Sequence, residues 1–332
     1  MTRYNHRERL ECILAGDRPD RPAASFWRHF FHMESTAEGT TEAMVWFQRR
    51  YDWDFVKINP RADYHVQDWG VQLGYSRDEF KKHTKVAFPI ETAADWARIQ
   101  PLAPSAPALA EHLKVVSEVR KALGKEIHLF MTVFTPLSLL GRLVGDLPRT
   151  VGYLREDTEL VLAALEAVTT TYERFVSEVR NAGADGLFFA TTHWASSELI
   201  TWAEYERFGV PFDLRVIRAA EADAVNILHV CDPHCYLEEL AALDYNSPML
   251  SWDSEHPTNV PLDRALGLFP TKVLVGGVDH EGWLRYASPE EITRRIQRLK
   301  VGYDGSRLIV GPGCAIPPEV PDINLRAIRE AL

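Results

Sequence analysis

The sequence has few cysteines, no excess of positive charge and no long apolar run. Its 332 residues include four cysteines, which suit metal binding, thiol reactivity or core packing better than disulfides in a reducing compartment. The formal net charge of −10 argues against a nucleic-acid partner, because clustered Lys and Arg drive phosphate binding. No apolar run approaches the roughly 20 residues that cross a bilayer, and residues 1–10 lack the apolar core of a signal peptide. We therefore expect a cytoplasmic protein with no membrane partner.

Several common catalytic motifs are also missing. The sequence has no phosphate-binding Walker loop, no His-Glu-x-x-His zinc motif and no serine nucleophile elbow. The glycines of residues 276–282 lack phosphate-loop spacing and are better explained as a tight loop after a strand. Asp232-Pro-His234 is similar to the start of a cobalamin-binding module, but Leu237 stands where that module has glycine. The chain is therefore not expected to carry a corrinoid domain of its own.

Eight short apolar or β-branched runs alternate with segments of helical spacing. The runs are residues 23–28, 55–59, 127–134, 186–190, 224–230, 248–252, 272–276 and 307–310. Helical spacing is clear in residues 158–180, 202–222 and 289–300. Alternation of buried strands with amphipathic helices favours a parallel sheet, and eight such units match a closed barrel. The sequence predicts an α/β fold, a (β/α)8 TIM barrel.

Two segments depart from the repeating pattern. Residues 7–14 predict an N-terminal helix that ends at Gly16 and caps the bottom of the barrel. Residues 61–125 form an insertion between strands 2 and 3, with a proline-rich break at residues 101–107 and one further helix. We expect part of this insertion to fold over the mouth of the barrel. No internal repeat or long linker is present, so a single domain is predicted over residues 1–332.

Three soft metal ligands follow predicted strands. The apolar run at residues 224–230 contains His229, and Cys231 comes two residues later, so both side chains point to the same face of an extended chain. Cys314 follows the last apolar run, after a break at glycines. The carboxyl ends of barrel strands share one rim, so these residues form a candidate Cys2His zinc site. Three protein ligands leave the fourth position open, and the soft, electron-rich donor set suits an incoming thiol better than water.

Other interpretations of these residues stay open. His229 is also compatible with a hydrogen-bonded core histidine, and Cys231 and Cys314 with small buried hydrophobic residues. Cys235, beside His234, is an alternative ligand or a residue packed in the first turn of the next helix.

Motifs spread along the whole chain resemble the uroporphyrinogen decarboxylase-like superfamily. They are Gly16-Asp-Arg-Pro-Asp-Arg-Pro22, Thr132-Val-Phe-Thr-Pro-Leu137, Tyr205-Glu-Arg-Phe-Gly-Val-Pro211, Leu274-Val-Gly-Gly-Val-Asp279 and Gly311-Pro-Gly-Cys-Ala-Ile-Pro-Pro318. The resemblance implies a (β/α)8 barrel and a homodimer. At the first two strand ends, where decarboxylases have Arg-Gln-Ala-Gly-Arg and an aspartate, this chain has Trp27-Arg-His-Phe-Phe31 and Lys57-Ile-Asn59. These differences argue against porphyrin decarboxylation.

The zinc-dependent methyltransferase branch of the superfamily, which moves methyl groups between corrinoid proteins and thiols, is similar in another respect. It carries His-x-Cys near strand 5 and a Pro-Gly-Cys loop after strand 8. The resemblance implies that His229, Cys231 and Cys314 bind Zn2+, and that the methyl donor or acceptor is a corrinoid on a separate protein. The other substrate would be a small thiol or a methylated compound.

Polar residues at the same rim complete the predicted site. We expect Asp253 or Asp279 to orient a ligand or contact substrate, and Arg28, Lys57, Asn59 and His193 to bind an anionic group of the substrate. Two alternatives remain. One is metal-free decarboxylation of uroporphyrinogen or a related acid, with Arg28 as the carboxylate clamp, and the other is a non-enzymatic binding or sensing protein.

Overall fold

The barrel is built from eight parallel strands. A computed structural model describes residues 4–303 and 305–332; residues 1–3, with which the predicted domain begins, and residue 304 lie outside this range. The strands follow the order β1-β10-β9-β8-β7-β6-β5-β2. Their bounds are Ala23–Ala24 (β1), Phe55–Ile58 (β2), His128–Phe134 (β5), Gly186–Ala190 (β6), Ile227–Val230 (β7), Met249–Trp252 (β8), Val273–Val278 (β9) and Leu308–Pro312 (β10). The predicted TIM barrel is confirmed, and each of the eight predicted runs overlaps a strand.

The two ends of the sheet meet between β1 and β2. The backbone N–H of Asp54 donates to the carbonyl of Ala24 at 2.8 Å, and the Ser25 hydroxyl donates to the carbonyl of Phe55 at 2.8 Å. These contacts bring the last strand of the order beside the first, so the sheet closes into a barrel.

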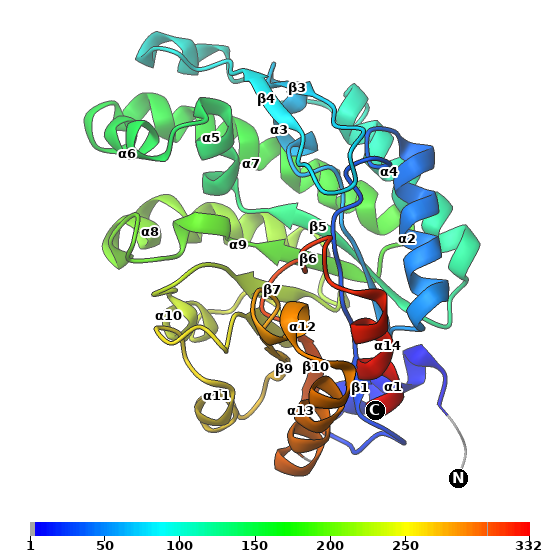
Figure 1. Ribbon diagram of the computed structural model, residues 1–332. Helices are drawn as coiled ribbons and strands as arrows, with labels where there is room; N and C mark the ends of the chain where they lie inside the picture. Colours follow the sequence, from blue (N-terminus) through cyan, green and yellow to red (C-terminus); the bar gives the residue numbers. More distant parts are fainter. Residues whose placement is uncertain (1–3, 304) are drawn as a thin grey trace.

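Helices surround the barrel and connect its strands (Figure 1). Most of them belong to the crossovers between parallel strands. Their bounds are Ala37–Tyr51 (α2), Pro107–Leu123 (α4), Pro136–Val144 (α5), Leu147–Glu156 (α6), Thr158–Asn181 (α7), Trp202–Phe208 (α8), Val210–Arg218 (α9), Leu237–Ala241 (α10), Leu262–Leu268 (α11), Trp283–Tyr286 (α12), Pro289–Gly302 (α13) and Asp322–Ala331 (α14), with a 3-10 turn at Thr192–Trp194 (η2).

The predicted N-terminal helix is also present. Helix α1 spans His6–Leu14, and Asn5 caps it by accepting a hydrogen bond from the backbone N–H of Glu8. Its buried Leu10 and Ile13 pack in the same apolar cluster as the strand residues inside the barrel, such as Phe55 and Ile309. The helix therefore closes the bottom of the barrel, as expected, and leaves the opposite end for a site.

The insertion between β2 and β5 contains more structure than the sequence indicated. Beyond α4 it forms a short helix α3 (Tyr64–Gln67), a 3-10 helix η1 (Ala93–Arg98) and an antiparallel hairpin of β3 (Gln72–Gly74) and β4 (Thr84–Ala87). No run in this part of the sequence predicted the hairpin, because its strands are mostly exposed and polar.

One predicted helix is interrupted. Residues 202–222 form two helices, α8 and α9, that meet at Gly209. Pro211 has no backbone N–H that could continue the first helix. A Cβ added at position 209 would lie only 2.8 Å from the ring of Tyr205, which is too close. Glycine therefore lets the two helices turn against each other.

Within the described ranges, no helix is both long and apolar enough to span a membrane.

Candidate metal centre

His229 and Cys231 lie at the carboxyl end of β7. His229 is buried inside the barrel, and its ring packs on Phe188 with 4.9 Å between ring centroids. Its Nδ1 lies 3.1 Å from the hydroxyl of Ser251, which pairs with it in register on β8. Its Nε2 lies 2.7 Å from the sulfur of Cys231. Ser251 therefore orients the ring so that Nε2 faces the cysteine.

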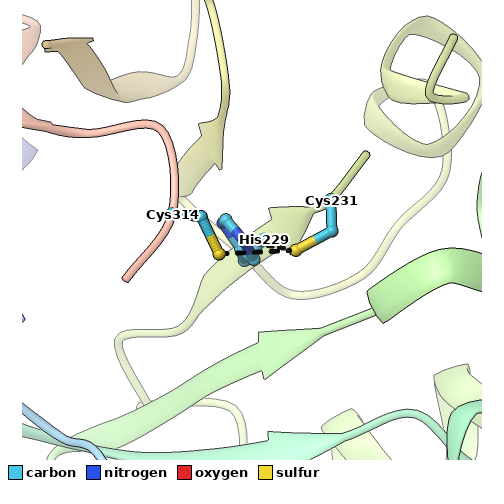
Figure 2. A group of neighbouring side chains, drawn as sticks. All are labelled: His229, Cys231 and Cys314. Carbon is cyan, nitrogen blue, oxygen red and sulfur yellow. Dashed lines mark hydrogen bonds between the residues drawn. The ribbon is translucent and has the colours of Figure 1, made fainter. Parts of the chain in front are cut away.

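Cys314 approaches the same point from the loop after β10. The preceding Gly313 lies against Asp253, since a Cβ at position 313 would stand 2.5 Å from the Asp253 Oδ1 atom. The sulfurs of Cys314 and Cys231 are 3.9 Å apart, and both cysteines are free. Figure 2 shows the imidazole and the two sulfurs converging. The three ligand atoms all lie within 4.8 Å of one another.

This donor set fits zinc. The 3.9 Å between the sulfurs is close to the separation of about 3.8 Å expected for two Zn–S bonds of about 2.3 Å in a tetrahedron. Two sulfurs and one imidazole nitrogen are soft ligands, and three protein ligands leave one coordination position for a substrate.

The hydrogen bond from Cys231 holds the pKa of the Cys314 thiol well below its ordinary value, with His229 acting in the same direction. The same hydrogen bond and burial raise the pKa of Cys231.

The three candidate metal ligands face a cavity of about 640 Å³ at the mouth of the barrel. That volume is of the size that holds a small organic molecule. Part of the wall comes from the insertion, which contributes Asp63, His83 and Lys85. The aromatic side chains of the wall are Trp27, Phe31, Phe80, Phe134 and Phe188.

Lys57 is the most deeply buried cation of this cavity. Its ammonium group donates to the Asn59 Oδ1 atom and lies 4.5 Å above the ring of Phe188. Burial lowers the Lys57 pKa to about 7, although Cys314, Cys231 and Glu34 act in the opposite direction. The Asn59 Nδ2 atom is buried without a hydrogen-bond partner among the described residues. Together these groups form an electropositive point in the wall.

The other predicted substrate-binding residues differ in position. His193 lines the cavity, and its Nδ1 contacts the carboxylate of Asp232. Arg28 is not among the lining residues; its guanidinium lies 2.7 Å from Glu79 of the insertion and over the ring of Phe30. The structure thus brings Lys57, Asn59 and His193 to the cavity, and binding of a substrate by them stays a prediction.

Asp253 and Asp279 take part in turns beside the site. Asp279 accepts hydrogen bonds from the backbone N–H groups of Gly282 and Trp283 at the start of α12, and Asp253 accepts one from Glu255. Neither residue lines the cavity. Their predicted catalytic role has no support in this placement and stays a prediction.

The alternative ligands, Cys235 and His234, lie apart from the three candidate metal ligands. Cys235 forms an isolated β-bridge with Ser196, and its side chain packs against the hydrophobic core. His234 lies 3.4 Å from Glu198. Among the described residues, neither joins the group formed by His229 and the two cysteines.

Sequence reasoning overlooked several residues of the site. Ser251 was not predicted, because its pairing with His229 between β7 and β8 is seen only in the structure. Glu34, His83 and Asp232 also line the cavity. Asp232 directly follows the candidate ligand Cys231, which was a usable signal. Glu34 and His83 lie outside regular strands and helices and gave no such signal.

A family model described as uroporphyrinogen decarboxylase (URO-D) matches residues 21–332. The chain belongs to the URO-D family. This membership confirms the resemblance noted in the sequence. It also places the chain in a family named after an enzyme.

Comparison with solved structures agrees with this fold. A methyltransferase from Methanosarcina mazei is similar, with a TM-score of 0.80 and 18% identity over 99% of this chain and 98% of that one. A B12-independent methionine synthase from Shewanella sp. W3-18-1, solved in complex with selenomethionine, has a TM-score of 0.57 and 13% identity over 93% and 96% of the two chains. At these identities the likeness establishes the fold alone. A search of curated proteins found no match.

Proposed function

We propose that this URO-D family member is a zinc-dependent methyltransferase that activates a thiol or another soft nucleophile. The observation that carries the proposal is the convergence of one imidazole nitrogen and two sulfurs within 4.8 Å. These atoms lie in the wall of a cavity large enough for a small substrate. The methyltransferase with a similar fold supports the same class of reaction.

His229, Cys231 and Cys314 would hold the zinc. Bound there, zinc would accept a thiol in its open position and lower the pKa of that thiol, so that the sulfur is nucleophilic near neutral pH. Ser251 fixes the His229 ring with Nε2 toward the site. Lys57 and Asn59 would bind an anionic or strongly polar end of the substrate, since both line the cavity and Asn59 retains an unpartnered buried donor. The aromatic walls would exclude water around the reacting groups.

The methyl donor or acceptor would be a corrinoid carried by a separate protein. The sequence lacks the glycine of a cobalamin-binding module after Asp232-Pro-His234. A partner would therefore present the corrinoid at the mouth of the barrel, in the reducing environment of the cytoplasm. The homodimer expected of the family is compatible with this arrangement, and size-exclusion chromatography with light scattering would test it.

Metal analysis of protein purified without chelator is the first test. We expect close to one zinc per chain in the wild type, and loss of zinc in the His229→Ala and Cys314→Ala variants. The Cys235→Ala variant is the matched control and should keep its zinc, because Cys235 lies outside the ligand group. Zinc-loaded protein should then transfer the methyl group of methylcobalamin to 2-mercaptoethanol. Zinc that remains in both ligand variants would overturn the proposal.

Decarboxylation is the alternative that the family name suggests. Its expected carboxylate clamp, Arg28, is paired with Glu79 and lies outside the cavity lining. No observation at this site favours that activity over methyl transfer. Zinc-free protein that converts uroporphyrinogen would nevertheless establish it and refute the zinc proposal.

A further inference from the structure

A second hydrogen-bonded unit, which contains none of the proposed metal ligands, lies in the wall of the same cavity. Its centre is the carboxylate of Glu34, which is only 2% exposed. The Glu34 Oε2 atom accepts a hydrogen bond from the backbone N–H of Phe30 and lies 3.0 Å from the Nδ1 atom of His29. His29, Glu34 and His83 all line the cavity.

Hydrogen bonding fixes the direction of the His29 ring. The N–H of Phe30 holds the Glu34 carboxylate, which accepts a hydrogen bond from the Nδ1–H of His29. This tautomer leaves Nε2 as the nitrogen with a free lone pair. No Lys or Arg side chain lies within ion-pair distance of Glu34 in the part of the chain that the structure describes. His83, on the hairpin of the insertion, approaches the other oxygen of Glu34 to 3.6 Å.

His83 completes the environment of the carboxylate as a neutral group. Its Nδ1 accepts a hydrogen bond from the backbone N–H of Ser76, so its Nε2–H points toward Glu34. Burial lowers the His83 pKa, although Glu34 opposes the shift. Glu34 thus lies between the imidazoles of His29 and His83. The charged side chains of Lys57, Arg61 and Asp63 also act in this part of the cavity.

His29 and Cys314 follow neighbouring strands of the barrel and line the same cavity. It follows β1, and Cys314 follows β10, which pairs with β1. The N–H of Ile316 donates to the carbonyl of Trp27 at 2.9 Å, so the two segments continue side by side beyond the strands. Trp27 and His29 line the cavity, whereas Arg28 between them contacts Glu79 of the insertion, as alternation along an extended chain requires.

We propose that His29, oriented by Glu34, is the proton acceptor for the substrate bound at the metal centre. This inference rests on the proposed methyl transfer and adds a catalytic residue to it. The S–H bond of the acceptor thiol breaks and its proton moves to His29 Nε2. The sulfur electron pair then forms the S–CH3 bond. The bond between the methyl carbon and cobalt of a methyl-corrinoid donor breaks, and cobalt keeps that electron pair. Water finally removes the proton from His29, and in the reverse direction the same nitrogen returns a proton to sulfur.

The other histidine–carboxylate pair of the cavity is less suited to this role. The His193 side chain is 57% exposed and its partner Asp232 is 30% exposed, against 21% for His29 and 2% for Glu34. Water competes strongly with proton transfer and with hydrogen bonding at the more exposed pair. Glu34 holds His29 in a single orientation in a drier environment, which is the arrangement that orients a catalytic histidine.

The experiment counts the protons that thiol binding releases. Zinc-loaded protein is titrated with 2-mercaptoethanol by calorimetry in buffers of different ionisation enthalpy. In the wild type the proton is retained on His29, whereas the His29→Gln variant should release up to about one more proton per bound thiol. The matched control is His32→Gln in the same loop, because His32 is exposed and does not line the cavity. It should behave as the wild type.

Turnover with methylcobalamin gives a second measurement. The kcat of His29→Gln should fall by about 100-fold or more with unchanged zinc content, and free imidazole should restore part of the kcat of His29→Ala. Glu34→Gln keeps the shape of the side chain and loses its charge, so kcat should fall while KM stays the same. This variant carries the test if His29→Gln does not fold.

The outcomes separate the two proposals. If the wild type binds no thiol, the methyltransferase proposal fails, and the role of His29 fails with it. If thiol binds and both the proton count and kcat are equal in the wild type and the variants, only the inference about His29 is refuted. Loss of zinc or of folding stability in Glu34→Gln, with an unchanged proton count, would assign the pair a structural role and would equally overturn the proposal.

Discussion

Replacement of Gly313 by alanine should weaken the proposed zinc binding without any change in the proposed ligands themselves. The added Cβ would lie 2.5 Å from the Asp253 Oδ1 atom and 2.8 Å from its Cβ. Ordinary contact begins at about 3.4 Å, so roughly 0.9 Å of movement is required. Asp253 is short and its Oδ1 accepts a hydrogen bond from the backbone of Glu255, so it does not swing away freely. The loop that carries Cys314 must therefore shift.

Such a shift is large for a metal site, where ligand distances hold to within about 0.2 Å. We expect Gly313→Ala to lower the zinc affinity at least about tenfold and the free energy of unfolding by about 1–3 kcal/mol. Competition with a chromophoric zinc chelator measures the first quantity, and urea unfolding of the metal-free protein the second. In Gly152→Ala the new methyl group meets nothing within 4 Å, so this variant is the matched control.

A double variant tests the cause. Asp253→Gly removes the crowded atoms, so the combination of Gly313→Ala with Asp253→Gly should recover zinc affinity relative to Gly313→Ala alone. Wild-type zinc affinity and wild-type unfolding in Gly313→Ala would refute the reasoning, and so would a double variant no better than the single one.

Three further predictions concern buried polar groups. Ser251→Ala removes the partner of His229 Nδ1, so the zinc affinity measured by chelator competition should fall by about 10–100-fold. Burial raises the pKa of Asp213 to about 7 despite hydrogen bonds from Tyr205 and Tyr245, so the folded protein keeps a proton that the unfolded chain releases near its ordinary pKa of 3.8. The free energy of unfolding should therefore fall by about 1.4 kcal/mol per pH unit between these two values and then level off, and urea unfolding from pH 4 to 8 should show this slope in the wild type but lose it in Asp213→Asn. Asp54 is buried beneath α1, where it pairs with both Arg9 and Arg21. Asp54→Ala leaves Arg21 without its carboxylate partner and leaves Arg9 with Asp20 alone, so it should cost about 3–5 kcal/mol in urea unfolding; a loss below about 1 kcal/mol would contradict this.

The barrel could be predicted because its signal is local. Each buried strand appears in the sequence as a short apolar run, and parallel strands place their carboxyl ends on one rim. His229 and Cys231 could be paired for the same reason, since side chains two residues apart share a face of an extended chain. Cys314 joins them because β10 ends at the same rim.

The remainder of the site depends on packing that the sequence does not display. Glu34 reaches His29 through a turn without regular periodicity, and His83 reaches Glu34 from a hairpin with no apolar run. Strand alternation beyond Trp27 was a signal that would have favoured His29 over Arg28 as the residue that faces the cavity. Asp279 shows that a carboxylate after a strand is an ambiguous signal, because such a carboxylate can also accept hydrogen bonds at the start of the next helix.

The division of the cavity wall between the barrel and the insertion has a consequence for how this protein could acquire new substrates. The three proposed metal ligands lie on β7 or just after β7 and β10, whereas His83 and Lys85 come from a hairpin that shares no strand pairing with the barrel. Changes in the length or charge of that hairpin would reshape its part of the cavity wall and leave the candidate metal centre in place. Related chains that share the two cysteines and the histidine but differ between residues 72 and 87 would thus keep one chemistry and accept different molecules.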